Sequence, residues 1–224
     1  MNWRDKPLLV TPSLLDSLDF FRSCPESWKK SAEQGLHDTL FRAPWRPTPE
    51  IEQGIKFENK VYELLRSSQF VEDFVARVNL ELPNRLPAET WPFVYRVAKG
   101  ASIQQVTKKV LEVEGQAFLL YGKMDIRLPS KIVDLKTTGN YKGPDKYLKK
   151  TQHLAYCLSE NCERFEYWVF EMREGLAHSF NVIDASVNLV SAKLLLEDAI
   201  KGLVEFLEDK PEWKDAYLTK FNRF

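Results

Sequence analysis

The chain has 224 residues and equal numbers of basic and acidic side chains, 32 of each, so its net charge is zero. This balance does not indicate a globally basic nucleic-acid binder, and any affinity for phosphates must come from a local patch. Three widely spaced cysteines argue against a disulfide framework and a cysteine zinc site, and they favour a reduced, intracellular setting. No apolar run approaches the roughly 20 residues that span a bilayer, so we expect a protein of the cytoplasm without a membrane partner.

The first hundred residues predict helices. A capped start at Thr11 to Ser13 precedes leucines at helical spacing, and Pro25 ends that helix. The segment Arg42 to Glu50 holds three prolines and predicts a surface loop. A longer amphipathic helix follows from Glu50 to Arg66. Between residues 70 and 100 we expect helical pieces divided by Pro83, Pro87 and Pro92.

The pattern of apolar and polar residues changes at Ser102. Alternating apolar and polar residues predict three antiparallel strands, with turns at Glu114-Gly115 and Pro129-Ser130. A loop over 139–145 leads into a helix from about Pro144 to Ser159. A strand at 165–174 follows, with a partner strand at 176–183. We therefore predict one mixed α/β domain over residues 1–224. Its parts are an N-terminal helical segment (11–45), a core (about 50–183) and C-terminal helices (185–222).

Two aspartates and a lysine stand in the strand-like stretch from Tyr121 to Thr138. Asp134 and Lys136 are two residues apart and share one face of a strand, while Leu135 points into the core. Asp125, on the preceding strand, lies beside Asp134 if the register allows. Adjacent carboxylates repel, and a hard cation such as Mg²⁺ removes the conflict. The alternative is a cross-strand ion pair between Asp125 and Lys136 on a solvated sheet face.

The flanking residues favour the first interpretation. Gly-Lys-Met-Asp125, then Ile-Val-Asp134-Leu-Lys136-Thr-Thr, then Gln152-His-Leu-Ala-Tyr156 resembles the PD-(D/E)XK nuclease superfamily, in particular its RecB-like and phage-exonuclease branches. Upstream, Gly54-Ile-Lys-Phe-Glu58 resembles the helix that carries an acidic residue in RecB-like members. The resemblance implies a restriction-endonuclease-like core: a helix, a three-strand antiparallel meander, a helix and a further strand.

The same resemblance implies a metal-dependent nuclease that hydrolyses DNA phosphodiester bonds, as an exonuclease in recombination, repair or replication. Glu58, Asp125, Asp134 and the Leu135 carbonyl are the expected ligands of Mg²⁺, for which Mn²⁺ would substitute. Lys136 is expected to position the attacking water. The alternative interpretation of Glu58 is a solvated residue of the helix with no role in the site.

Downstream residues are expected to meet the substrate. The i, i+4 pair Gln152 and Tyr156 would contact the DNA strand or orient the lysine, unless Tyr156 simply packs in the core. Tyr141 could stack on a base. The best candidates for phosphate contacts are Lys142, Lys146, Lys149 and Lys150. Alternatively, these lysines form a solvated helix face.

Some RecB-like nucleases bind an iron–sulfur cluster through four cysteines. Only Cys24 matches that pattern, and no cysteine follows Cys162, so we predict no cluster. Two alternative functions remain: a site-specific or structure-specific endonuclease, and a non-catalytic nucleic-acid-binding protein. A homo-oligomer or a recombination or replication protein partner also stays open, and the compact size resembles stand-alone nucleases of bacterial or phage-infected cells.

Overall fold

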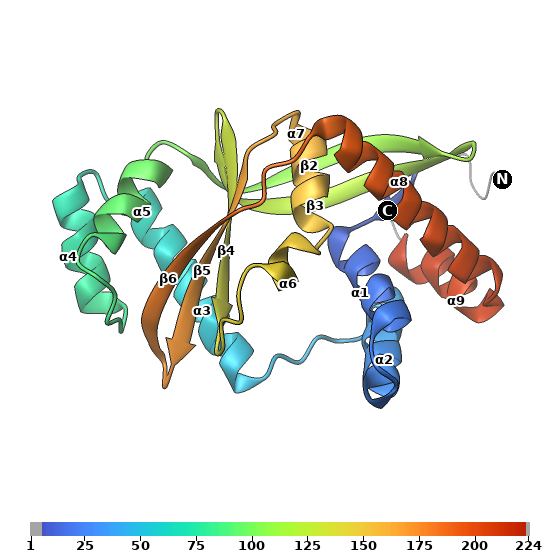
Figure 1. Cartoon of the computed structure of the whole chain (residues 1–224), viewed down its shortest axis with the longest axis horizontal. Coiled ribbons are helices and arrows are strands. Elements are labelled where there is room, and N and C mark those ends of the chain that lie inside the picture. The colour runs from blue at the N-terminus through green and yellow to red at the C-terminus, as the bar shows by residue number, and fades with distance from the viewer. Residues whose placement is uncertain (1–5, 223–224) are drawn as a thin grey trace.

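The computed structural model describes residues 6–222 as a six-stranded sheet with helices packed around it (Figure 1). The elements in chain order are β1 (Leu8–Val10), α1 (Pro12–Ser23), a 3₁₀ turn (Glu26–Trp28), α2 (Lys29–Leu40), α3 (Pro49–Ser67), α4 (Val71–Glu81), α5 (Thr90–Ala98), β2 (Ser102–Val113), β3 (Gln116–Leu128), β4 (Lys131–Thr138), α6 (Asp145–Leu148), α7 (Gln152–Glu160), β5 (Phe165–Arg173), β6 (Leu176–Asp184), α8 (Leu189–Glu208), α9 (Pro211–Ala216) and a π turn (Tyr217–Phe221).

The sheet forks along β3. One edge of β3 pairs with β2 in an antiparallel ladder along almost its whole length. The other edge is shared, because β1 pairs with it in parallel at 118–120 and β4 pairs antiparallel at 126–128. After Val133, β4 leaves β3 and continues in parallel beside β5, whose other neighbour is β6. Within the described chain, residues 121–125 of β3 therefore have no strand partner on the shared edge.

The described residues form two apolar cores, and β3, β4, β5 and β6 contribute side chains to both. The helices of the first core are mainly α1, α2, α7 and α8, whereas those of the second are α3, α4 and α5. The two cores meet at β4, where Ile132 packs in the first core and Val133 and Leu135 pack in the second. Helix α7 packs on β2 and β3, whereas α3 packs on β4 (Figure 1). The fork thus places α3 and α7 on the two sides of β4.

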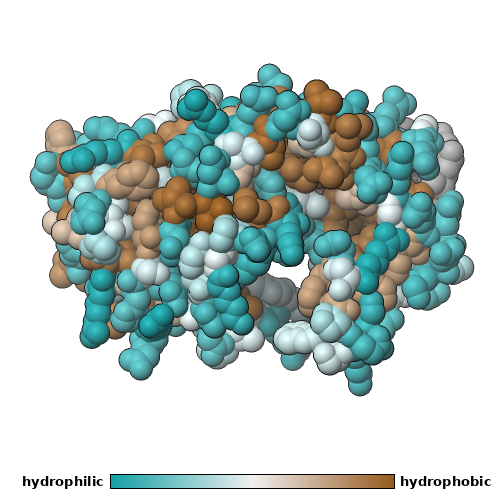
Figure 2. All heavy atoms as spheres, in the orientation of Figure 1, coloured by the Kyte–Doolittle hydropathy of each residue, from teal (hydrophilic) through white to brown (hydrophobic). Residues whose placement is uncertain are grey.

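The space-filling view shows an opening in the middle of the molecule (Figure 2). In the matching ribbon view, α6 and the loop before it lie above this opening (Figure 1). The segment that joins α2 to α3 runs below it, α3 begins on one side, and α1 and α2 stand on the other. Among residues 6–222, no helix combines the length and the apolar character needed to cross a membrane.

The sequence predicted most elements, with four corrections. The helix predicted from about Pro144 to Ser159 is two helices, α6 and α7, because Asp16 of α1 accepts hydrogen bonds from the Thr151 backbone N–H (2.8 Å) and hydroxyl (3.0 Å) and holds a turn there. Helix α8 begins at Leu189 rather than 185, since the Asn188 side chain caps it. Pro92 lies inside the first turn of α5 and does not divide it. Strand β1 was not predicted.

Gly54 marks where α3 approaches the sheet most closely. A Cβ at this position would overlap the Thr137 hydroxyl of β4, whereas a Cβ at Gly35 of α2 would meet nothing within 4 Å. Gly35→Ala should therefore raise the free energy of unfolding by about 0.5–1 kcal/mol through its helix propensity. Gly54→Ala should lower it by about 1–3 kcal/mol through overpacking. Urea denaturation of the two helical variants measures both effects, and equal stabilisation by both would contradict the close contact between α3 and β4.

Candidate active site

Asp134 is the most buried charged side chain at the fork, with 1% of its surface exposed. Its Oδ1 accepts a hydrogen bond from Gln152 Nε2 at 2.6 Å, and its Oδ2 lies 2.6 Å from Lys136 Nζ. A buried carboxylate requires such partners, because removal from water without them is costly. The β4 lysine and the first residue of α7 therefore fix the orientation of one carboxylate from two directions.

Asp125 faces Asp134 across the point where the strands separate. The β3–β4 ladder ends with the pair Ile126 and Val133, so Asp125 and Asp134 would form the next pair if the ladder continued. Instead, Asp125 Oδ2 accepts a hydrogen bond from the Leu135 backbone N–H at 2.9 Å. The carboxylate takes the place of the missing backbone acceptor, which satisfies a donor that the fork would otherwise leave unpaired.

The core in which the buried side chains of β3 pack changes at the same residue. Met124 packs in the first core, but Ile126, two positions later, packs in the second. On the opposite strand, Gln104 has a positive φ of 57° and pairs with no residue of β3. Asp125 therefore stands at an irregularity between the two cores, where a polar side chain reaches the site rather than an apolar interior.

Glu58 reaches the site from α3. Its Oε1 accepts a hydrogen bond from the Thr137 hydroxyl at 3.2 Å. Thr137 is also the residue that contacts Gly54, one helical turn before Glu58. The missing Cβ at Gly54 thus allows α3 to lie close enough to β4 for the Glu58 carboxylate to join the site, which gives a physical reason for the Gly-x-x-x-Glu spacing.

The electrostatics reflect three carboxylates held near one ammonium. Burial raises the pKa of the Glu58 carboxyl to about 7; the Lys136 ammonium opposes this and Asp134 adds to it. Burial and the neighbouring Asp134 also raise the pKa of Asp125 well above its ordinary value. Burial lowers the pKa of Lys136, but the charges of Asp134 and Asp125 outweigh this, so its pKa lies above the ordinary value. Lys136 is therefore a protonated donor at neutral pH.

The alternative interpretation, a cross-strand ion pair between Asp125 and Lys136 on a solvated face, is not the arrangement found. Lys136 pairs with Asp134 on its own strand, and Asp134 is buried. Asp125 instead binds a backbone N–H. Lys136 keeps 35% of its side chain exposed, so its ammonium lies at the mouth of the site.

Two residues of the site were not among those predicted. Thr137 bridges α3 and β4, as described above. Tyr62 lies one helical turn after Glu58 on α3. Burial is the main cause that raises the pKa of its hydroxyl, and the charge of Asp125 raises it further. The hydroxyl is buried beside Asp125, where it lowers the pKa of that carboxyl against the larger effect of burial. The i, i+4 spacing from Glu58 was the signal in the sequence that would have indicated Tyr62.

Tyr156 has a supporting position. It is buried, and its hydroxyl donates to the Lys123 carbonyl of β3 at 3.0 Å. A Cβ at Gly122 would overlap its ring, so this glycine of the motif makes room for the tyrosine of α7. Together these contacts fill the shared edge of β3 where no strand pairs. Gln152 hydrogen-bonds Asp134 rather than the lysine, and its expected contact with the DNA strand stays a prediction.

The residues predicted to contact bases and phosphates are Tyr141 and four lysines. Tyr141 is half-buried and stacks on Tyr147, with ring centroids 6.4 Å apart. The lysines do not share one helix face, because the chain turns between α6 and α7. All four lysines are exposed, and Lys146 Nζ donates to the Thr138 hydroxyl at 3.3 Å, two residues beyond Lys136.

The donor types suit a hard divalent cation, since carboxylate and carbonyl oxygens are what Mg²⁺ binds. The carboxylates of Glu58, Asp125 and Asp134 lie close together, since the charge of Asp134 raises the pKa of both Glu58 and Asp125. Among residues 6–222 no three His, Cys, Asp or Glu side chains are grouped so that they could hold a metal ion. Cation binding would thus require Asp134 Oδ2 to exchange its Lys136 partner for the metal.

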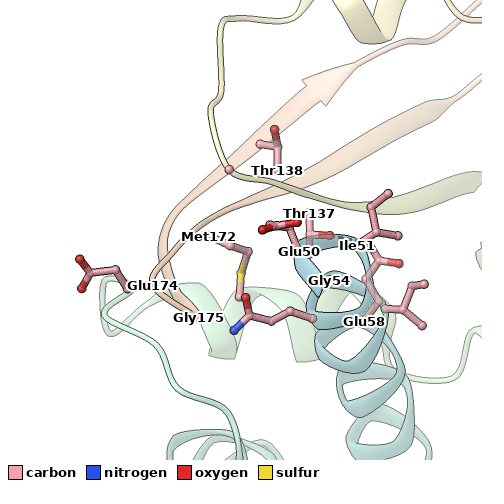
Figure 3. Close-up of a pocket in the computed structure, with 12 residues that line it drawn as sticks. Glu50, Ile51, Gly54, Glu58, Thr137, Thr138, Met172, Glu174 and Gly175 are labelled. Carbon is pink, nitrogen blue, oxygen red and sulfur yellow. Dashed lines mark hydrogen bonds between the residues drawn. The ribbon is translucent and has the colours of Figure 1, made fainter. Parts of the chain in front are cut away.

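A pocket of about 620 Å³ opens beside Glu58 (Figure 3). It lies between the first half of α3, the end of β4 and the turn from β5 to β6. Its lining residues are Glu50, Ile51, Gln53, Gly54, Ile55, Glu58, Thr137, Thr138, Gly139, Met172, Glu174 and Gly175. The pocket gives solvent and small groups access to the α3 side of the site.

No family model matches the chain, and no curated protein matches it. An alkaline exonuclease from Laribacter hongkongensis (LHK-Exo) has a similar structure, with a TM-score of 0.52 and 10% identity over 95% of this chain and 94% of that chain. At this identity the similarity shows a shared fold. Two further structures have lower TM-scores. They are SSO0001 (TM-score 0.48, 12% identity, over 88% of this chain and 78% of that chain) and Scheffersomyces stipitis Rai1 (TM-score 0.36, 10% identity, over 92% of this chain and 62% of that chain).

The raised pKa of Glu58 predicts a pH-dependent stability of the protein in EDTA. The folded state holds this proton more tightly than the unfolded state, whose carboxyl titrates near 4.5. Stability should therefore fall as pH rises from about 4.5 through 7. Glu58→Gln should reduce this fall, whereas Glu52→Gln, on the exposed face of the same helix, should not. Urea midpoints measured between pH 5 and 8 test this, and an unchanged slope in Glu58→Gln would refute the buried, charge-crowded site.

Proposed function

We propose that the chain is a metal-dependent nuclease that hydrolyses DNA phosphodiester bonds, acting as an exonuclease. The observation that carries the proposal is that both carboxylate oxygens of Asp134 are bound. Gln152 of α7 binds one oxygen, and Lys136 of β4 binds the other. A buried carboxylate with an ammonium beside it, at a solvent-accessible edge, suits the transfer of a phosphoryl group to water. The fold shared with an alkaline exonuclease also supports this assignment.

In this proposal Asp125, Asp134, Glu58 and the Leu135 carbonyl would hold Mg²⁺, for which Mn²⁺ would substitute. The ion would supply Lewis-acid stabilisation of charge on the phosphate. Gln152 fixes the carboxylate plane of Asp134 through its hydrogen bond. Thr137 holds Glu58 against β4. These contacts keep the carboxylates in place before substrate arrives.

Lys136 has the role of a donor. Because its pKa is raised, the side chain carries a proton at neutral pH and cannot accept one from water. Its ammonium positions the attacking water and stabilises negative charge that develops on the phosphate oxygens. Lys146 of α6 lies next to the end of β4, and together with the neighbouring lysines it would contact the phosphates of the substrate strand.

Hydrolysis should depend on the β4 lysine in particular. Lys136→Ala and Asp134→Ala should each lower the rate on end-labelled linear DNA with Mg²⁺ by about 10²–10⁴-fold, since each removes a group that acts on the reacting phosphate. Lys131→Ala is the matched control, because Lys131 is on the same strand but pairs with Glu166 at 2.7 Å. Full activity in both site variants would reject the assignment, and rapid nicking of closed circles would favour the endonuclease alternative.

Metal binding should be measurable without any substrate. At a Mg²⁺ concentration 100 times its dissociation constant, the folded protein should gain about 2.7 kcal/mol. Asp134→Asn should lose this gain, because the variant keeps the shape but not the charge of the ligand. Asp198→Asn, on the exposed face of α8, should retain it. Thermal unfolding with and without Mg²⁺ gives the comparison, and equal stabilisation of both variants would exclude Asp134 as a ligand.

A further inference from the structure

Strand β2 is an edge of the sheet, and most of its outer side is open. In the described chain its only strand partner is β3, and β2 forms the outer edge of their long ribbon (Figure 1). At the start of β2, Arg66 Nη2 donates to the Ile103 carbonyl at 3.3 Å. From residue 105 to 113, no backbone hydrogen bond within residues 6–222 reaches a segment other than β3. A long open edge of this kind is a template on which another strand can pair.

Contacts with α7 determine which face of β2 is exposed. The Thr107 hydroxyl donates to the Glu160 carboxylate, and the Lys109 ammonium donates to a backbone carbonyl of the same helix at 3.0 Å. The odd-numbered side chains of this part of the strand therefore face α7. Of the even-numbered side chains on the opposite face, Val110 is 55% exposed. The exposed residues of that face are Val106, Lys108, Val110 and Glu112.

The exposed residues of β2 are self-complementary about Val110. When two copies of one strand pair antiparallel around a two-fold axis, each residue and its partner point to the same face. With the axis at Val110, each Lys108 lies opposite Glu112 of the other copy, and the two Val110 side chains meet. Moving the axis one residue toward the start of β2 would place Lys109 opposite itself. Moving it one residue toward the end would place Val110 opposite Glu112, so the axis at Val110 is the favoured register.

Lys108 and Glu112 are available for contacts with a second copy. Neither side chain takes part in an ion pair among residues 6–222. Lys108 Nζ lies over the Tyr121 ring of β3, 5.7 Å from its centroid. Beside Val110 on the same face is Leu119 of β3, which is half-buried like Tyr121. The surface next to the open edge is therefore partly apolar, and opposite charges at the edge would align a partner strand.

We propose that two copies of this chain associate through their β2 edges, as an antiparallel pair of strands with the two-fold axis at Val110. The two sheets then form one continuous sheet, and the pair of Lys108 with Glu112 occurs twice. Because β3 pairs with β2 and carries Asp125, the dimer would hold two candidate sites in a fixed relation. The inference goes beyond the proposed function, and it holds whether or not the chain hydrolyses DNA.

Analytical ultracentrifugation of a dilution series, without DNA or metal, tests the association. The wild-type chain should form a species of twice the monomer mass. Val110→Lys places two ammonium groups opposite each other at the axis and should raise the dissociation constant at least about tenfold. The matched control is Val182→Lys, since Val182 is 45% exposed on β6 at the other end of the sheet, and it should leave the constant unchanged. A monomer at every concentration, or an oligomer that Val110→Lys leaves intact, would overturn the proposal.

Charge reversal tests the register. Lys108→Glu and Glu112→Lys each create two like-charged pairs in a dimer of identical copies, so each should raise the dissociation constant at least about tenfold. A mixture of these two variants should associate about as tightly as the wild-type chain, because every reversed residue then faces an opposite charge. Lys123→Glu, exposed on the same face of β3 but not at the edge, should associate like the wild type. Circular dichroism checks that each variant is folded, and a folded pair that fails to associate on mixing would overturn the proposed pairing.

Discussion

The separation of β4 from β3 after Val133 is the constraint on which the site depends. A backbone N–H cannot be left unpaired in the interior, so the N–H of Leu135 needs an acceptor once the ladder stops. Asp125 provides it through its side chain. The edge of β3 that the departure exposes needs cover as well, and Tyr156 of α7 supplies it by bonding to the Lys123 carbonyl. The fork thereby brings an acidic side chain and a helix to the same place.

The fork also determines the charge balance. Asp134 has two partners, but Asp125 and Glu58 are left in a partly buried region with only one ammonium among three carboxylates. Their pKa values are raised first by burial, and the charge of Asp134 adds to this. A protein can relieve the excess by taking up protons or by binding a cation, and only the second leaves the carboxylates ionised at neutral pH. The unfavourable electrostatics are thus a reason to expect a cation rather than an incidental property of the site.

Local periodicity was enough to predict the meander, the α3 helix and the shared face of Asp134 and Lys136, because each depends on neighbours within a few residues. The break between α6 and α7 could not be predicted in this way, since Asp16, 135 residues earlier, determines it. Strand β1 has only three residues, too few for a period, and it is a strand because β3 pairs with it. The opening has the same origin, because it exists only when distant segments close on one another.

The motif glycines show why the separate pieces of the sequence pattern belong together. Gly54 is needed because Thr137 approaches α3, and Thr137 is the residue that holds Glu58. Gly122 is needed because the ring of Tyr156 lies over β3, and the same helix supplies Gln152 to Asp134. Each glycine accommodates a residue from another part of the pattern. A chance Asp-x-Lys on a solvated sheet would require none of these contacts, whereas a site assembled from α3, β3, β4 and α7 requires all of them at once.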